Sequence, residues 1–167
     1  MKRVCKKGQM KLSFGMIFSI ILIIIFVAFA FYAITKFLDL KNKVEIGKFI
    51  EDLEEDIDKL WKGAQGSQEV EYFIPKKIEY VCFVDFDSVA GGEDKNFYIN
   101  LRKAKSSEEN LVFYPVGSAG GLDSKKIEHI NIESITEINN PYCIKQSKGK
   151  VKLILEKDFS ESLVRIS

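Results

Sequence analysis

The sequence predicts an α+β protein in which a long N-terminal helix, with a transmembrane half and an amphipathic half, packs on a small antiparallel β domain. Residues 12–35 form a charge-free apolar run, residues 36–62 carry apolar side chains at helical spacing, and beyond residue 63 the hydrophobic period shortens to two. The chain has 167 residues, which is enough for one membrane segment and one domain of roughly 100 residues.

The apolar run is long enough to cross a lipid bilayer. Its 24 residues lie between Lys11 and Lys36, and as a helix they would extend about 36 Å, against a hydrocarbon core of about 30 Å. A buried core helix that is apolar on every face would need a much larger protein around it. We therefore expect a single membrane-spanning helix with the lipid bilayer as its partner.

The distribution of charge predicts the orientation of this helix. Five basic residues and no acid lie within residues 1–35, so that of 25 basic residues in all, 20 remain downstream against 24 acids. The positive-inside rule places the N-terminus in the cytoplasm and the C-terminal domain outside it. No basic stripe is present for a nucleic-acid partner.

Three fates of the N-terminus stay open. Ala28-Phe29-Ala30 has the small-x-small pattern of a secretory cleavage site, although the apolar region exceeds the usual length of about 7 to 15 residues. An uncleaved signal anchor is the second fate. The third is cleavage on the cytoplasmic side of the span, at the pair Gly8-Gln9.

The basic leader ending in Lys6-Lys7-Gly8, followed by Gln9 and an uninterrupted apolar helix, resembles the class III signal peptide of archaeal type IV pilin-like proteins. The resemblance implies that a prepilin peptidase cuts between Gly8 and Gln9 and that the helix packs against other pilin-like subunits. Counted from Gln9, Ser13 occupies the fifth position, where major pilins usually carry glutamate. The resemblance therefore implies a minor or accessory subunit of a surface filament or secretion pseudopilus. The alternative is a single-pass signal-anchor protein whose outer domain binds a ligand or partner protein.

The predicted organisation is a cytoplasmic leader at 1–8, a transmembrane helix at 9–35, an amphipathic helix continuing from it at 36–63, and an extracytoplasmic antiparallel β domain at 64–167. The amphipathic part carries a packing stripe at spacings of three and four, and Gly63 is a plausible helix cap. The stripe comprises Ile46, Ile50, Leu53, Ile57, Leu60 and Trp61. It would pack either on the protein's own sheet or on a neighbouring subunit.

The β domain is expected to contain six or seven short strands. Eight candidate stretches with an alternating or β-rich sequence occur, at 70–74, 78–84, 97–101, 111–116, 127–132, 142–146, 150–156 and 162–166. Residues 63–69 would link helix and domain, and residues 146–149 would form a turn between two strands.

Cys82 and Cys143 both lie in the domain predicted to be outside the cell, which favours a disulfide. Closing a loop of about 60 residues would contribute about 4 kcal/mol, and two buried free thiols are the alternative. A zinc site is not expected, because there is no Cys-x-x-Cys pair and His129 is the one histidine.

The sequence predicts no catalytic, cofactor-binding or metal-ligating residues, and hence a protein that is not an enzyme. The sequence has no Gly-x-Ser-x-Gly motif whose serine His129 could activate as a catalytic base. The acidic stretch with Asp85, Asp87, Glu93 and Asp94 fails the EF-hand spacing and reads as a solvated loop. Residues 117–121 lack the Gly-Lys-Ser/Thr ending of a phosphate loop.

Overall fold

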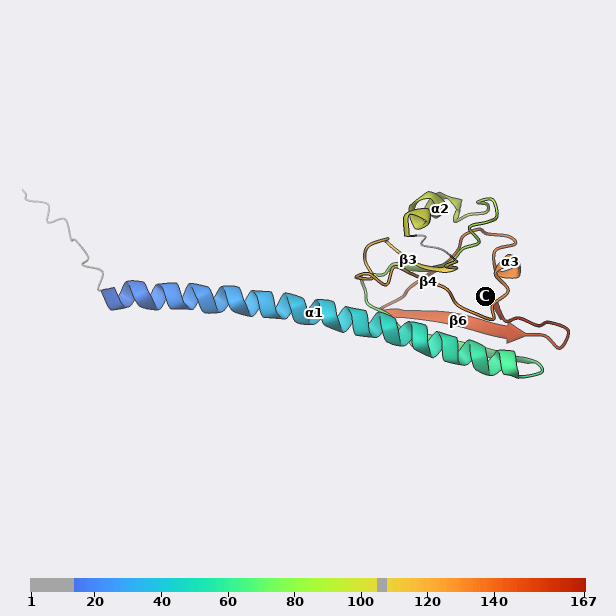
Figure 1. Ribbon diagram of the computed structural model, residues 1–167, viewed down its shortest axis with the longest axis horizontal. Coiled ribbons are helices and arrows are strands. Elements are labelled where there is room, and N and C mark those ends of the chain that lie inside the picture. The colour runs from blue at the N-terminus through green and yellow to red at the C-terminus, as the bar shows by residue number, and fades with distance from the viewer. Residues whose placement is uncertain (1–13, 105–107) are drawn as a thin grey trace, which may run out of the picture. The chain divides into compact units, whose positions relative to one another are not determined.

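The computed structural model describes residues 14–104 and 108–167 (Figure 1). The first helix, α1, is continuous from Phe14 to Lys62, as the absence of proline in this stretch predicts. Two compact units divide the chain, residues 1–38 and residues 39–167. The second unit holds the C-terminal half of α1 and all of the strands.

Two antiparallel sheets make up the second unit. One has the order β1-β6-β7, with β1 at Gly66–Phe73, β6 at Lys150–Lys157 and β7 at Arg165–Ile166. The other has the order β4-β3-β2-β5, with β4 at Ser124–Lys125, β3 at Leu111–Tyr114, β2 at Tyr80–Phe83 and β5 at Tyr142–Lys145. The predicted α+β class, a long N-terminal helix with a small antiparallel domain, is confirmed.

The main hydrophobic core lies between α1 and the inner faces of both sheets. Alternation along each strand assigns Leu153 and Leu155 of β6, and Val81 and Phe83 of β2, to this core. Phe49 of α1 lies at its centre, where its ring meets those of Tyr72 and Phe113 edge-on.

A smaller core covers the opposite face of the second sheet. Cys82, Val84 and Val112 alternate with the residues that face the main core, and they pack with Leu101. Leu101 ends the helix α2 at Lys95–Leu101, which is followed by the 3₁₀ helix η1 at Arg102–Ala104. The central strands of the second sheet, β2 and β3, are therefore buried on both faces.

The predicted strand at 97–101 is wrong, because these residues form α2. Leu101 is buried and Ile99 is 75% exposed, a helical rather than an alternating pattern. Packing on the sheet overrides the strand preference of Phe97 and Tyr98, which lie half-buried against the smaller core.

The predicted strand at 127–132 is also wrong. It is reduced to one bridge between Ile130 and Val164, and Ile132 begins the short helix α3 at Ile132–Ile135. The Asn131 side chain accepts a hydrogen bond from the Ser134 N–H at 3.0 Å, so a capping residue ends the extended stretch. The predicted linker at 63–69 is shorter than expected, because β1 already begins at Gly66.

Candidate functional site

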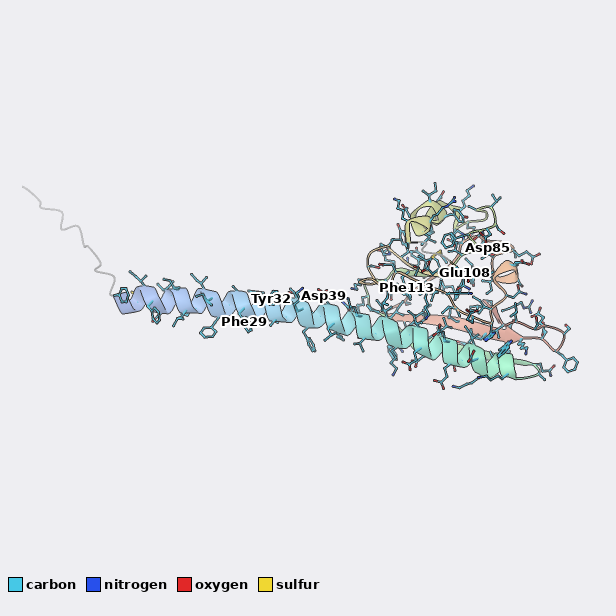
Figure 2. All side chains as sticks on the ribbon, viewed as in Figure 1. Phe29, Tyr32, Asp39, Asp85, Glu108 and Phe113 are labelled. Carbon is cyan, nitrogen blue, oxygen red and sulfur yellow. A yellow bond between two sulfur atoms is a disulfide. The ribbon has the colours of Figure 1, made fainter. Side chains whose placement is uncertain are left out.

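Residues 14–38 expose apolar side chains on all sides of the helix. Phe26, Phe29 and Phe31 are each about two-thirds exposed, and Figure 2 shows the Phe29 side chain projecting from the helix. Within the described residues, α1 is the one helix long and apolar enough to cross a membrane. This candidate span near the N-terminus is consistent with a single-pass membrane protein.

Two of the three hydroxyl side chains in this segment, those of Ser19 and Thr35, form hydrogen bonds within the helix. Ser19 Oγ donates to the Gly15 carbonyl and Thr35 Oγ1 donates to the Tyr32 carbonyl, each at 2.9 Å. Such bonds to the preceding turn lower the cost of placing these two hydroxyl groups in an apolar environment.

The processing residues predicted from the sequence, Gly8 and Gln9, lie outside the described residues, as do Cys5 and Ser13. Their roles remain predictions.

The packing stripe of α1 lies on the protein's own β domain. Ile46, Ile50, Leu53 and Ile57 are buried in the main core, and Leu60 packs partly buried against it. Phe49, which the sequence analysis did not select, is only 1% exposed. Its spacing of three from Ile46 and four from Leu53 is the signal that could have identified it.

The C-terminal end of α1 is held by residues that are distant in sequence. Trp61, 36% exposed, stacks on His129 with ring centroids 3.6 Å apart, and His129 Nε2 lies 3.8 Å from Asp58 Oδ1. The buried Lys157 donates from Nζ to the carbonyls of Trp61 at 2.6 Å and Gly63 at 2.8 Å. A cation that binds terminal helix carbonyls offsets their partial negative charge. His129 therefore belongs to a packing contact.

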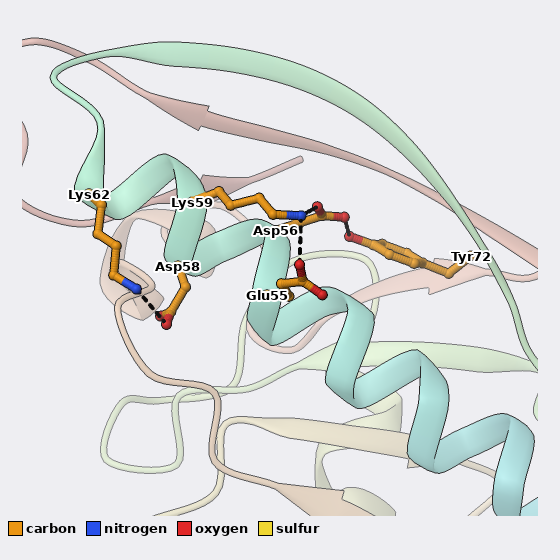
Figure 3. Close-up of polar contacts among 6 residues, drawn as sticks. All are labelled: Glu55, Asp56, Asp58, Lys59, Lys62 and Tyr72. Atoms are coloured by element: carbon orange, nitrogen blue, oxygen red, sulfur yellow. Dashed lines mark hydrogen bonds and ion pairs between the residues drawn. The ribbon is translucent and has the colours of Figure 1, made fainter.

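A second anchor joins α1 to β1, as Figure 3 shows. Tyr72 Oη donates to Asp56 Oδ2 at 2.8 Å. Burial, and then the hydrogen bond to Asp56, raise the pKa of the Tyr72 hydroxyl. Glu55 pairs with Lys59 at 3.0 Å and Asp58 pairs with Lys62 at 3.5 Å, on the exposed side of the helix.

Cys82 and Cys143 form the predicted disulfide. They are directly opposite each other in the antiparallel pairing of β2 with β5, with Cα atoms 4.0 Å apart. The bond lies in the smaller core beneath α2. It closes the long segment that contains β3, β4 and all the short helices of the domain.

The two loops considered as ligand sites use their polar groups internally. Asp85 accepts hydrogen bonds from the Asp87 N–H at 2.9 Å and the Ser88 hydroxyl at 2.6 Å. In the glycine-rich loop, Asp123 Oδ1 accepts from the N–H groups of Gly117 and Ala119 at 2.7 and 3.0 Å. Among the described residues, no group of three or more His, Cys, Asp or Glu side chains is placed to hold a metal ion.

No protein-family model matches the chain, and no curated protein and no solved structure shows significant similarity to it. The functional conclusion therefore rests on architecture. A long N-terminal apolar helix packed on a small antiparallel β domain fits a pilin-like arrangement.

Proposed function

We propose that the protein is a membrane-anchored, pilin-like structural subunit of minor or accessory type, in a surface filament or secretion pseudopilus. It acts by helix-mediated assembly and not by catalysis. The observation that carries this proposal is α1 itself. One uninterrupted helix supplies an exposed apolar segment at residues 14–38 and, further on, the buried stripe of the β domain.

The two parts of α1 differ in what they contact, and this difference supports the proposed role. The stripe from Ile46 to Leu60 is occupied by the domain's own core, so lateral contacts with other subunits fall to residues 9–35. The partners are the lipid bilayer, a prepilin peptidase that removes residues 1–8, and other pilin-like subunits. The five basic residues of the N-terminal segment favour a cytoplasmic N-terminus, and the disulfide suits an oxidising exterior.

A second candidate is an uncleaved anchor whose outer domain binds a ligand or partner without polymerising. Ser13 favours it, because this position lacks the glutamate that would neutralise a neighbouring N-terminal amine. An unpaired positive charge among packed helices costs several kcal/mol.

The deciding experiment is intact-mass and N-terminal analysis of the protein recovered from membranes of its native host. We expect a chain that starts at Gln9. A Gly8→Leu variant should remain unprocessed, because the peptidase site accepts a small residue, whereas the matched Gly15→Leu variant should be processed normally. Recovery of unmodified chains that retain Cys5 would contradict the pilin-like proposal, and a start near Phe31 would indicate a released, secreted domain.

Cysteine crosslinking tests assembly separately. In a Cys5→Ser background, an Ala28→Cys substitution would add the one free thiol whether or not residues 1–8 are removed, since Cys82 and Cys143 are joined. We expect disulfide-linked dimers of this variant in native membranes when helices pack side by side. A Leu40→Cys variant controls for chance collisions outside the span. Equal, low crosslinking of both would favour the simple anchor.

A further inference from the structure

Among the residues that the structure describes, no strand pairs with the outer edge of β1. β1 pairs with β6 from Gly66–Lys157 to Phe73–Lys150, and the Ile74 N–H donates to the Gly149 carbonyl just beyond. Because hydrogen-bonded pairs alternate along an antiparallel ladder, the backbone groups of even-numbered β1 residues point to β6. Those of the odd-numbered residues point away, and within residues 14–104 and 108–167 they have no hydrogen-bond partner. The odd-numbered residues are Ser67, Glu69, Glu71 and Phe73.

An open groove of about 450 Å³ runs along this edge. Figure 3 labels four of its lining residues, Glu55, Asp56, Lys59 and Tyr72. One wall is α1 and the other is the central part of β1. The lining residues are Asp52, Glu55, Asp56 and Lys59 from α1, and Glu69, Val70, Glu71 and Tyr72 from β1. The free backbone groups therefore face accessible space.

The α1 wall of the groove is acidic. Lys59 is the one cation among the described residues of this wall, and it pairs with both Glu55 at 3.0 Å and Asp56 at 3.5 Å. Asp52 has no ion-pair partner among the residues that the structure describes. The α1 wall thus carries three carboxylates against a single ammonium group. An incoming segment with positive side chains would compensate the excess charge.

The β1 wall carries two carboxylates on its outer face, and each is balanced by a lysine of β6. Glu69 and Glu71 pair with Lys152 and Lys150 of β6, so these carboxylates are held beside the edge by the neighbouring strand. If two copies of β1 paired with each other, Glu69 of one copy would lie opposite Glu71 of the other. In a shifted register, one of these two residues would lie opposite the same residue of the other copy. Like charges directly opposite each other destabilise a strand pair. The edge thus disfavours a second copy, and the excess of carboxylates on the α1 wall favours a basic strand.

We propose that the β1 edge binds an extended, Lys- or Arg-containing segment of a partner protein by strand addition. The four N–H and four carbonyl groups of the odd-numbered β1 residues supply main-chain bonds. Alternate side chains of the partner meet Asp52 and Asp56 on one face of the sheet, and Glu69 and Glu71 on the other. This site does not use the membrane helix and goes beyond the assembly role proposed above.

The test uses the full chain in nanodiscs of zwitterionic lipid, so that a basic peptide does not bind the bilayer. The probe is a fluorescent eight-residue peptide that alternates Lys with Val, and its control replaces each Lys with Glu. We expect the Lys peptide to bind at least tenfold more tightly. We also expect it to slow hydrogen exchange at the amides of Ser67, Glu69, Glu71 and Phe73.

Two substitutions at Glu69 separate main-chain bonding from charge. Glu69→Pro removes an outward N–H without touching the ladder to β6, whereas Glu69→Thr removes the same charge and keeps the N–H. We expect at least tenfold weaker binding for the proline variant than for the threonine variant. If the proline variant unfolds, Asp52→Asn with Glu55→Gln provides the test. It should weaken binding at least fivefold, while Glu128→Gln with Glu133→Gln, outside the groove, should not.

The proposal is overturned if the Lys and Glu peptides bind equally or not at all. It is likewise overturned if peptide binding leaves exchange at the four amides unchanged. Protection of the same amides that appears without peptide as protein concentration rises would assign the edge to a second copy and exclude the basic partner. None of these results depends on where the N-terminus is processed, so they are separable from the test of the pilin-like role.

Discussion

The Tyr72 hydroxyl donates a 2.8 Å hydrogen bond to Asp56 Oδ2 and so joins the first strand of the β domain to the amphipathic half of α1. The Tyr72 side chain also packs its ring edge-on against Phe49. The contact therefore combines a polar anchor at the groove with the largest fully buried side chain of α1.

We expect Tyr72→Phe to lower the free energy of unfolding by about 1 kcal/mol at neutral pH, the usual contribution of one hydrogen bond. Urea denaturation followed by the fluorescence of Trp61, the single tryptophan, measures this change. An unchanged midpoint would mean that water replaces the bond without loss.

The same contact predicts a pH dependence. The pKa of Tyr72 is raised from its ordinary value of 10.0 by burial and by Asp56. Above pH 10 the unfolded chain loses this proton while the folded chain keeps it, so this contribution is complete below pH 10 and declines as pH rises further. Denaturation series at pH 9 and pH 11 should show a smaller decline for Tyr72→Phe than for the unaltered protein. Equal declines would contradict this assignment.

Two leucines on α1 form a matched pair for testing the stripe. Leu53 is fully buried and Leu40 is 61% exposed. We expect Leu53→Ala to destabilise the protein by about 2 to 5 kcal/mol and Leu40→Ala by less than about 0.5 kcal/mol. Thermal unfolding of both variants measures the difference. Loss of assembly without loss of stability in Leu53→Ala would instead identify the stripe as a contact between subunits.

Lys157 should stabilise the end of α1 by binding its terminal carbonyls. We expect Lys157→Met to cost about 1 to 3 kcal/mol, because it leaves these acceptors without their charged donor. Lys152→Met, on the exposed face of the same strand, removes only a surface ion pair with Glu69 and should cost about 0 to 1 kcal/mol. Hydrogen exchange of the last turn of α1 should rise in the first variant alone.

The Cys82–Cys143 bond closes a loop with a sequence separation of 61. A Cys82→Ala, Cys143→Ala double variant should lose about 4 kcal/mol of stability through the larger entropy of its unfolded chain. A reducing agent should lower the denaturation midpoint of the unaltered protein and leave that of the double variant unchanged. Equal sensitivity of both proteins to the reducing agent would contradict this account.

Local pattern was sufficient to predict the parts of the protein that depend on nearby residues. Several features follow from a hydrophobic pattern that is visible within about ten residues. They are the apolar run of α1, the spacing of Ile46, Ile50, Leu53 and Ile57, and the strands β3, β5 and β6. The pairing of Cys82 with Cys143 also followed from the sequence, because only two cysteines lie in the predicted outer domain.

Other features arise only when distant segments meet. Phe97 and Tyr98 have a preference for strands, yet they become part of α2 because a helix covers the second face of the sheet better. Lys157 reaches the carbonyl of Trp61, 96 residues earlier, and no local period encodes that distance. The free edge of β1 is likewise a property of strand order, since a strand's own residues do not specify which neighbours pair with it. Local periodicity thus accounts for the helix and most strands. The binding of Lys157 to the end of α1 and the open edge of β1 depend instead on long-range packing.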